Sequence, residues 1–234
     1  MSAARSFLFA IALTIVTPPY AVIALLSAPL PRLTRYWIIS GWSRLILWLS
    51  RVILGIEWRV EGREHLPSRP AVILAKHQSA WETLAFQHIF PPQVHVLKRE
   101  LLWIPFFGWG LALMSPIAID RARGVKALRA IARRGQKRLE QGFWVVVFPE
   151  GTRVAPGESR DYQPGGAWLA AASGAPVVPV AHNAGLYWPR NAFLKRAGTI
   201  TIRIGPSIDS RQRDPLTINA MAKEWIEEQQ KALG

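Results

Sequence analysis

The chain has 234 residues, a formal net charge of +14 and no cysteine. This length suffices for one α/β domain with a sizeable core and an appendage, and the lack of cysteine excludes disulfides, thiolate nucleophiles and cysteine-ligated metals. Half of the residues are hydrophobic, so the positive charge indicates a polyanionic partner such as nucleic acid, an anionic membrane face or a phosphorylated substrate.

The N-terminal segment, residues 7–30, carries no charged side chain and is long enough to cross a bilayer as one straight helix. Pro18 and Pro19 lie near its middle, and residues 7–17 alone would form roughly 16 Å of helix, about half of the hydrocarbon thickness. We therefore expect a helical hairpin or a kinked anchor that dips into one leaflet. A cleaved signal peptide ending near Ala28 is the alternative, but the segment that follows still resembles a membrane segment.

A second apolar segment, residues 36–56, is predicted to be an amphipathic helix. At 100° per residue Ser40, Ser43, Arg44 and Arg51 fall within one stripe. A basic helix rich in tryptophan is typical of the membrane interface, although a core helix of the soluble domain would give a similar pattern. We therefore predict a membrane-associated anchor over residues 1–56 and an α/β domain over residues 57–234.

From residue 57 onward, strand-like runs alternate with helical patterns. Strands are predicted at 57–61, 71–75, 93–97, 117–121, 143–148, 175–180 and 199–204, and helices at 81–89, 125–141, 166–173 and 217–233. The β-branched run 143–148 is typical of a central parallel strand, and the alternating run 199–204 of an edge or antiparallel strand. The apolar stretch 101–110 contains a proline and two glycines, so we expect a packed loop or groove wall there. The predicted fold is an α/β fold whose mixed, mostly parallel sheet is flanked by helices, with an N-terminal two-helix membrane anchor.

The first candidate site lies where the apolar run 71–75 ends and a helical pattern begins. His77 and Glu82 are five positions apart, about 140° on a regular helix, so they can meet only if His77 lies in the turn and Glu82 in the first helical turn. A carboxylate there would orient the imidazole to take a proton from a hydroxyl. Ser79 and Glu82 also fit a capping box, and this capping role is compatible with the chemical one.

Three further strand ends carry polar groups, namely Lys98, Arg121 and the run from Glu150 to Arg153. In a mostly parallel sheet these groups would converge on one edge. A base surrounded by cations suits a substrate with a reacting hydroxyl and a nearby phosphate. Gly151 allows a tight turn that approaches a ligand closely, although the same run could form a plain turn with a surface Glu–Arg pair.

Taken in order, these motifs resemble the glycerolipid acyltransferase family, in particular its bacterial 1-acyl-sn-glycerol-3-phosphate acyltransferases, over about residues 57–210. The family's first block is usually His-x4-Asp, and this chain carries Glu82 at the acidic position. The resemblance implies His77 as the general base, Glu82 as its orienting acid, and Lys98 and Arg121 as phosphate-binding residues. It also implies that Glu150, Gly151, Thr152 and Arg153 hold the glycerol phosphate and that Val178, Pro179 and Val180 line the acyl side.

The implied reaction moves a fatty acyl group from acyl-CoA or acyl carrier protein to the sn-2 hydroxyl of lysophosphatidate, giving phosphatidate for phospholipid synthesis. No cofactor is implied. The five histidines lack the spacing of a metal site, and the chain has neither a G-x-S-x-G elbow nor a cysteine for a covalent acyl-enzyme. The expected partners are membrane lipids, the lysophospholipid acceptor and the acyl donor, and the expected location is the bacterial inner membrane with the catalytic domain on the cytoplasmic side.

Other functions remain open on sequence grounds. The acceptor could be another lysophospholipid or an amino-acid lipid, and the chain could be a non-catalytic, membrane-tethered lipid-binding protein. A metal-dependent hydrolase lacks a ligand motif, and a nucleic-acid-binding module lacks a reader motif. We therefore expect no nucleic acid partner.

Overall fold

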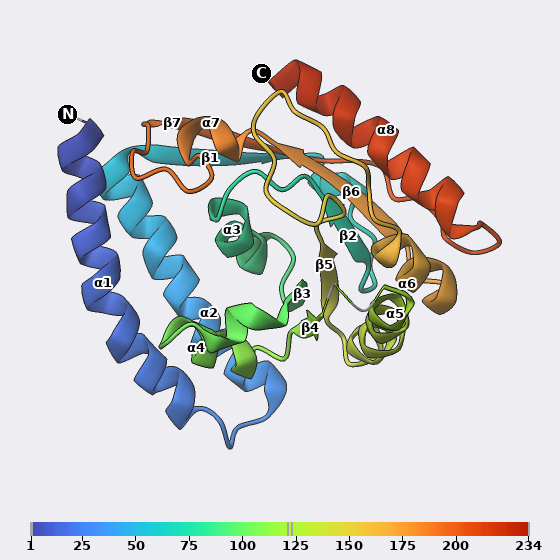
Figure 1. Cartoon of the computed structure of the whole chain (residues 1–234), viewed down its shortest axis with the longest axis horizontal. Helices are drawn as coiled ribbons and strands as arrows, with labels where there is room; N and C mark the ends of the chain where they lie inside the picture. Colours follow the sequence, from blue (N-terminus) through green and yellow to red (C-terminus); the bar gives the residue numbers. More distant parts are fainter. Residues whose placement is uncertain (1, 121, 123, 234) are drawn as a thin grey trace.

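The computed structural model describes residues 2–120, 122 and 124–233, and its centre is a seven-stranded sheet (Figure 1). The strand order is β1-β7-β6-β2-β5-β3-β4, and all neighbours are parallel except β6 and β7, which are antiparallel. The predicted mixed, mostly parallel sheet is confirmed. The strands are β1 (Ile56–Glu61), β2 (Val72–Ala75), β3 (Gln93–Lys98), β4 (Ile117–Ile119), β5 (Trp144–Val147), β6 (Val177–His182) and β7 (Gly198–Ile204).

Helices cover both faces of the sheet because successive strand side chains point to opposite faces. In β2, Val72 and Leu74 pack toward α5, α6 and α8, whereas Ile73 and Ala75 pack toward α1, α2 and α3. The helices are α1 (Ser2–Leu26), α2 (Arg32–Leu49), α3 (Trp81–Ile89), α4 (Phe107–Leu113), α5 (Val125–Glu140), α6 (Gly165–Ser173), α7 (Ala184–Tyr187) and α8 (Pro215–Leu233).

The N-terminal hairpin differs from the prediction, because α1 continues through Pro18 and Pro19 and the chain reverses only at residues 27–31. Each proline removes one amide donor from the helix. The carbonyls left without those donors belong to Thr14 and Ile15, which are exposed, so no unpaired group enters the core. Figure 1 shows α1 and α2 side by side (blue), and both are long and apolar enough to cross a membrane.

The polar stripe predicted for the second helix is divided between the core and the surface. Ser40 and Ser43 are fully buried, and the Ser43 hydroxyl lies 3.1 Å from the Gln87 side-chain oxygen and 2.8 Å from His88 Nε2 on α3. The two arginines of the stripe, Arg44 and Arg51, are exposed. Ser43 is thus a polar contact between α2 and α3, as in the core-helix alternative, while the Ser40 hydroxyl donates to the Trp37 carbonyl of its own helix.

The apolar core continues across the expected domain boundary at residue 56. Phe9 of α1, Ile46 of α2 and Leu54 of the π-helical turn that extends α2 belong to the same buried cluster as Trp81 of α3 and strand residues of the sheet. Residue 56 therefore marks a change from helices to α/β structure, but the two parts share one core.

The stretch expected to be a loop, residues 101–110, is largely helical. A 3-10 turn (Arg99–Trp103) leads into α4, where the Gly108 amide donates to the Ile104 carbonyl at 2.7 Å. A side chain at position 108 would collide with the Leu102 carbonyl, so this glycine permits the tight entry into the helix. The expectation of a groove wall is met, because residues of this stretch line the cavity described below.

Candidate active site

The turn after β2 brings His77 and Glu82 together, as the spacing predicted. His77 Nδ1 lies 2.8 Å from Glu82 Oε1. Because an ionised carboxylate only accepts hydrogen bonds, Nδ1 carries the proton and Nε2 is left as the basic nitrogen. The imidazole also stacks on the Phe148 ring, with centroids 4.0 Å apart and planes 14° apart. The ring of His77 is therefore held by a hydrogen bond at one edge and an aromatic face beside it.

Glu82 serves both of the roles that the sequence left open. Its Oε1 also accepts the backbone amides of Gln78 at 3.0 Å and Ser79 at 2.8 Å, while the Ser79 hydroxyl accepts the Trp81 amide. Burial alone would raise the pKa of Glu82. The neighbouring His182, the hydrogen bond and charge of His77 and the Ser79 amide together outweigh burial and lower this pKa below its usual range. The carboxylate is thus kept ionised beside the base.

The Glu150 carboxylate is paired inside the protein and does not line the cavity that contains His77, which corrects its predicted role in phosphate binding. Its side chain is fully buried, with Oε1 2.7 Å from Lys76 Nζ and Oε2 accepting the His77 amide at 2.9 Å. Burial raises the pKa of Glu150, and Lys76 opposes this shift. A carboxylate would also repel a phosphate, so Glu150 instead connects its own turn to the turn that carries His77. The alternative of a surface Glu–Arg pair is wrong as well.

The rest of the Glu-Gly-Thr-Arg turn reaches a cavity of about 440 Å³ that also contains His77. Gly151 has φ of +70°, the conformation that makes glycine suitable there. Thr152, Arg153 and Lys98 line the same cavity, as predicted. Arg121 lies outside the described residues.

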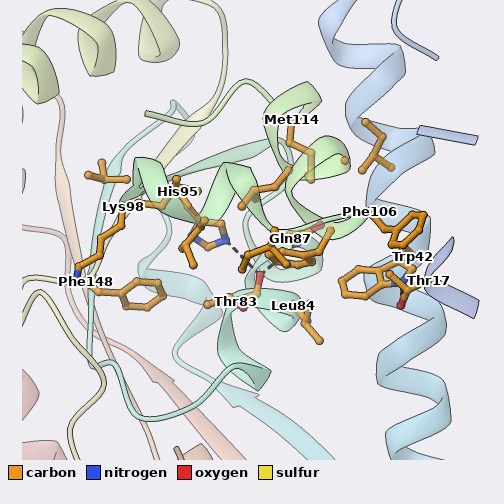
Figure 2. A pocket seen from close by; sticks show the side chains of 18 of the residues that line it. Thr17, Trp42, Thr83, Leu84, Gln87, His95, Lys98, Phe106, Met114 and Phe148 are labelled. Atoms are coloured by element: carbon orange, nitrogen blue, oxygen red, sulfur yellow. Dashed lines mark hydrogen bonds between the residues drawn. The ribbon is translucent and has the colours of Figure 1, made fainter. Parts of the chain in front are cut away.

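The cavity has a polar end and an apolar end. Figure 2 shows Lys98 and Phe148 at one end and Thr17, Trp42 and Phe106 at the other, next to α1 and α2. The lining at the apolar end comes from three helices that are distant in sequence, and includes Ala21, Ala24, Ile39, Phe107, Gly110 and Leu111. Such a shape suits a ligand with a charged head and a long apolar chain.

Two lining residues at the polar end, Arg190 and Asn191, were not predicted from the sequence. They follow α7 in a loop, not a strand end, so the rule that located Lys98 could not find them. Arg190 donates to the Arg153 carbonyl at 2.7 Å. The described lining residues thus include three cations and no carboxylate.

His95, which belongs to none of the sequence motifs, also lines the cavity. Its ring is roughly parallel to Phe148, with centroids 5.8 Å apart and planes 16° apart. Burial lowers the pKa of His95 to about 4 despite a contact with the Thr83 carbonyl that opposes the shift. His95 is therefore neutral at physiological pH.

The run Val178, Pro179 and Val180, expected to line the acyl side, lies instead in the sheet core. All three belong to β6 and are buried, and none lines the cavity. Val178 and Val180 pack in the cluster formed by α1, α2 and α3. The helices on the two faces cover these side chains, because β6 lies inside the sheet between β7 and β2.

The site thus has a base held by a carboxylate in a turn after a parallel strand. Beside it lies a cationic cavity with an apolar extension. These features can be compared with known proteins. A protein-family model described as Acyltransferase matches residues 57–183, more than half of the chain. The chain belongs to the acyltransferase family. The family match includes the His77 turn and the Glu-Gly-Thr-Arg turn, and it ends just after β6.

Relatives within the acyltransferase family agree with this assignment. The 1-acyl-sn-glycerol-3-phosphate acyltransferase of Pseudomonas aeruginosa is 43% identical over 97% of this chain and 91% of that protein. The 1-acyl-sn-glycerol-3-phosphate acyltransferase alpha of Mus musculus is 30% identical over 76% of this chain and 64% of that protein. The crystal structure of the 1-acyl-sn-glycerophosphate acyltransferase from Thermotoga maritima has the same fold, with a TM-score of 0.81, 21% identity and coverage of 99% of this chain and 95% of that one.

Proposed function

We propose that this acyltransferase moves a fatty acyl group from a thioester donor, acyl-CoA or acyl carrier protein, to the sn-2 hydroxyl of lysophosphatidate and so produces phosphatidate. The observation that carries this proposal is the cavity, which joins His77 to three cations at one end and to an apolar pocket at the other. Phosphate prefers such cations, Arg in bidentate contact and Lys as a point charge. The names of the relatives support the same acceptor.

In the proposed mechanism His77 Nε2 takes the proton of the acceptor hydroxyl while the oxygen attacks the thioester carbonyl. The new C–O bond forms, the C–S bond breaks, and the leaving thiolate takes the proton back from His77. Glu82 stabilises the imidazolium that forms between these steps. Neither a covalent acyl-enzyme nor a cofactor is needed.

The cations would position the acceptor. Lys98 and Arg153 lie at the same end of the cavity as His77, so a phosphate bound there places the nearby hydroxyl within reach of the imidazole. Arg121 is proposed to join them. Holding two substrates in a reactive geometry contributes several kcal/mol to such reactions, on the order of 7–11 in favourable cases.

The membrane is proposed to supply the acceptor along α1 and α2. Side chains such as Phe7, Ile15 and Leu26 on α1 are exposed, as are Trp103 and Trp109 beside the cavity. Burying these groups in lipid is favourable by roughly 25 cal/mol for each Å² of apolar surface. We place the protein at the bacterial inner membrane, with the catalytic domain on the cytoplasmic side where thioester donors are found.

Acyl transfer by the purified, detergent-solubilised protein tests this function. Lysophosphatidate is offered with oleoyl-CoA or oleoyl-acyl carrier protein, and lysophosphatidylcholine serves as an acceptor without a phosphate monoester. We expect phosphatidate from the wild type and from His65→Ala, which alters a histidine bonded to the Ile204 carbonyl outside the cavity. His77→Ala should abolish it, with a loss of about 10²–10⁴-fold typical of a missing general base.

The phosphate site is tested separately. Arg153→Ala and Lys98→Ala should raise KM for lysophosphatidate by on the order of 10-fold or more each, because charge-assisted hydrogen bonds contribute about 1.5–3 kcal/mol. Arg160→Ala, at an exposed arginine outside this cavity, is the matched control. Faster turnover of lysophosphatidylcholine than of lysophosphatidate would overturn the acceptor, and no transfer by folded protein to either lipid would overturn the reaction.

A further inference from the structure

Lys76, the residue directly before His77, is one of the most deeply buried side chains of the protein, with 1% of its surface exposed. Because side chains alternate along a strand and its extension, Lys76 points to the face of the sheet covered by α8, while His77 points to the cavity. A buried ammonium group is very unfavourable unless it is paired and hydrogen-bonded. Its partners are therefore informative.

Lys76 Nζ has three partners, each from a different part of the chain. It lies 2.7 Å from Glu150 Oε1 and 2.9 Å from Glu227 Oε1 on α8, and it donates to the Glu158 carbonyl at 2.9 Å. The Tyr162 hydroxyl donates to the same Glu227 oxygen at 3.0 Å. One lysine thus joins two carboxylates, one on the Glu-Gly-Thr-Arg turn and one on the C-terminal helix.

Glu150 connects Lys76 to the base, because its second oxygen accepts the His77 backbone amide at 2.9 Å. On the other side of His77, the Gln78 side chain donates to Gln230 Oε1 of α8 at 2.8 Å. Glu227 and Gln230 are three residues apart and therefore share one face of α8. The C-terminal helix holds the residues on both sides of His77 from the face of the sheet opposite the cavity.

We propose that Lys76 and Glu227 form a positioning pair for the proposed acyl transfer. The pair keeps the Glu150 carboxylate aimed at the His77 amide and so fixes the imidazole relative to the substrate end of the cavity. Neither residue touches the substrate. Without Glu227, Lys76 faces one carboxylate, and the turn keeps only the Gln78–Gln230 bond of its two ties to α8. A base displaced by about 1 Å can lower the rate by on the order of 10²-fold.

The test compares Glu227→Ala with Glu228→Ala, its exposed neighbour on the same helix, in the full-length protein. Alanine favours helix at both positions, so α8 is retained. With lysophosphatidate and oleoyl-CoA, Glu227→Ala should lower kcat by about 10- to 100-fold and leave KM for lysophosphatidate within about twofold. Glu228→Ala should behave as wild type. Lys76→Met should lose at least as much kcat, and Lys76→Met with Glu227→Ala should be no worse than Lys76→Met alone.

The kinetic part of this inference rests on the proposed function. A second measurement does not depend on turnover and so tests the inference separately from that function. Amide hydrogen exchange in peptides covering residues 76–79 should be faster in Glu227→Ala by on the order of 10-fold, with exchange in β2 and β5 unchanged. The inference is overturned if Glu227→Ala matches Glu228→Ala in both measurements. It is also overturned if exchange rises across the whole chain, or if KM rises while kcat is unchanged. If Lys76→Met does not fold, the Glu227→Ala results decide.

Discussion

Replacing Glu82 with glutamine measures how much the buried carboxylate contributes to proton transfer at His77. The glutamine carbonyl can still accept the amides of Gln78 and Ser79, so the turn and the start of α3 are retained. What is lost is a negative charge whose oxygen lies 2.8 Å from His77 Nδ1. In the proposed mechanism this charge stabilises the imidazolium that forms when the acceptor hydroxyl gives up its proton.

The size of the effect follows from Coulomb's law. Two unit charges roughly 4 Å apart attract by about 4 kcal/mol at an effective dielectric constant of 20. His77 is 15% exposed, and water there reduces the attraction, so we expect about 2–4 kcal/mol, or a kcat lower by about 30- to 1,000-fold. KM for lysophosphatidate should stay within about twofold, because Glu82 lies outside the described cavity lining.

Steady-state kinetics of Glu82→Gln with lysophosphatidate and oleoyl-CoA provide the assay, and Glu64→Gln, at an exposed glutamate, is the control. Circular dichroism and thermal melting establish that both variants are folded. A kcat within threefold of wild type would refute the reasoning, since it would show that the charge of Glu82 does not act on the transition state. A higher KM with an unchanged kcat would instead assign Glu82 to substrate binding.

Three further predictions concern pH, chain length and the membrane. Burial holds the pKa of His95 at about 4, so from pH 6.5 downward the unfolded chain binds a proton that the folded protein excludes. This residue should therefore lower the free energy of unfolding by about 3 kcal/mol between pH 7 and pH 4. In urea unfolding, His95→Phe should lack that part of the decrease. A variant whose free energy of unfolding depends on pH as in the wild type would contradict this. Gly110→Leu fills the apolar end of the cavity and should shift the preference for lysophosphatidate to shorter acyl chains, by about fourfold per methylene excluded. An unchanged ranking of palmitoyl- and lauroyl-lysophosphatidate in competition assays would place the chain elsewhere. Ile15→Asp, at a 65% exposed position of α1, should weaken sedimentation with anionic vesicles by on the order of 10²-fold. The control Leu216→Asp, at an exposed position of α8, should not weaken it. Equal effects of the two variants would contradict binding through α1.

The pattern of apolar and polar residues was sufficient to predict most of the α/β architecture. Strand and helix bounds at 93–98, 81–89 and 125–140 agree with the prediction within one residue, because burial on one or both faces imposes periods of 2.0 and 3.6 on the sequence. The rule that parallel strands end at a common edge placed His77, Lys98 and Arg153 in one cavity. Spacing alone also predicted that Glu82 meets His77.

Local patterns failed where the outcome depended on what packs around a segment. The double proline in α1 predicts a break in an isolated helix, but packing against α2 and α4 keeps the helix continuous, and the exposed side tolerates the missing hydrogen bonds. Likewise, Ser43 resembles part of a solvent-facing stripe until α3 supplies Gln87 and His88 as partners. A stripe of polar residues shows which side chains share a face, not which element covers it.

By itself, then, the sequence determined the order of strands and helices, the turn that carries the base, the excess of positive charge and the apolar N-terminal segments. Only the tertiary structure decided that Glu150 is a buried ion-pair partner of Lys76, that Val180 lies in the core and that Arg190 reaches the cavity. These contacts join residues far apart in the chain, 73 positions for Glu150 and His77 and 151 for Lys76 and Glu227. No periodicity encodes a contact at that separation, because it forms only when the sheet order and the helices on each face bring the two segments together.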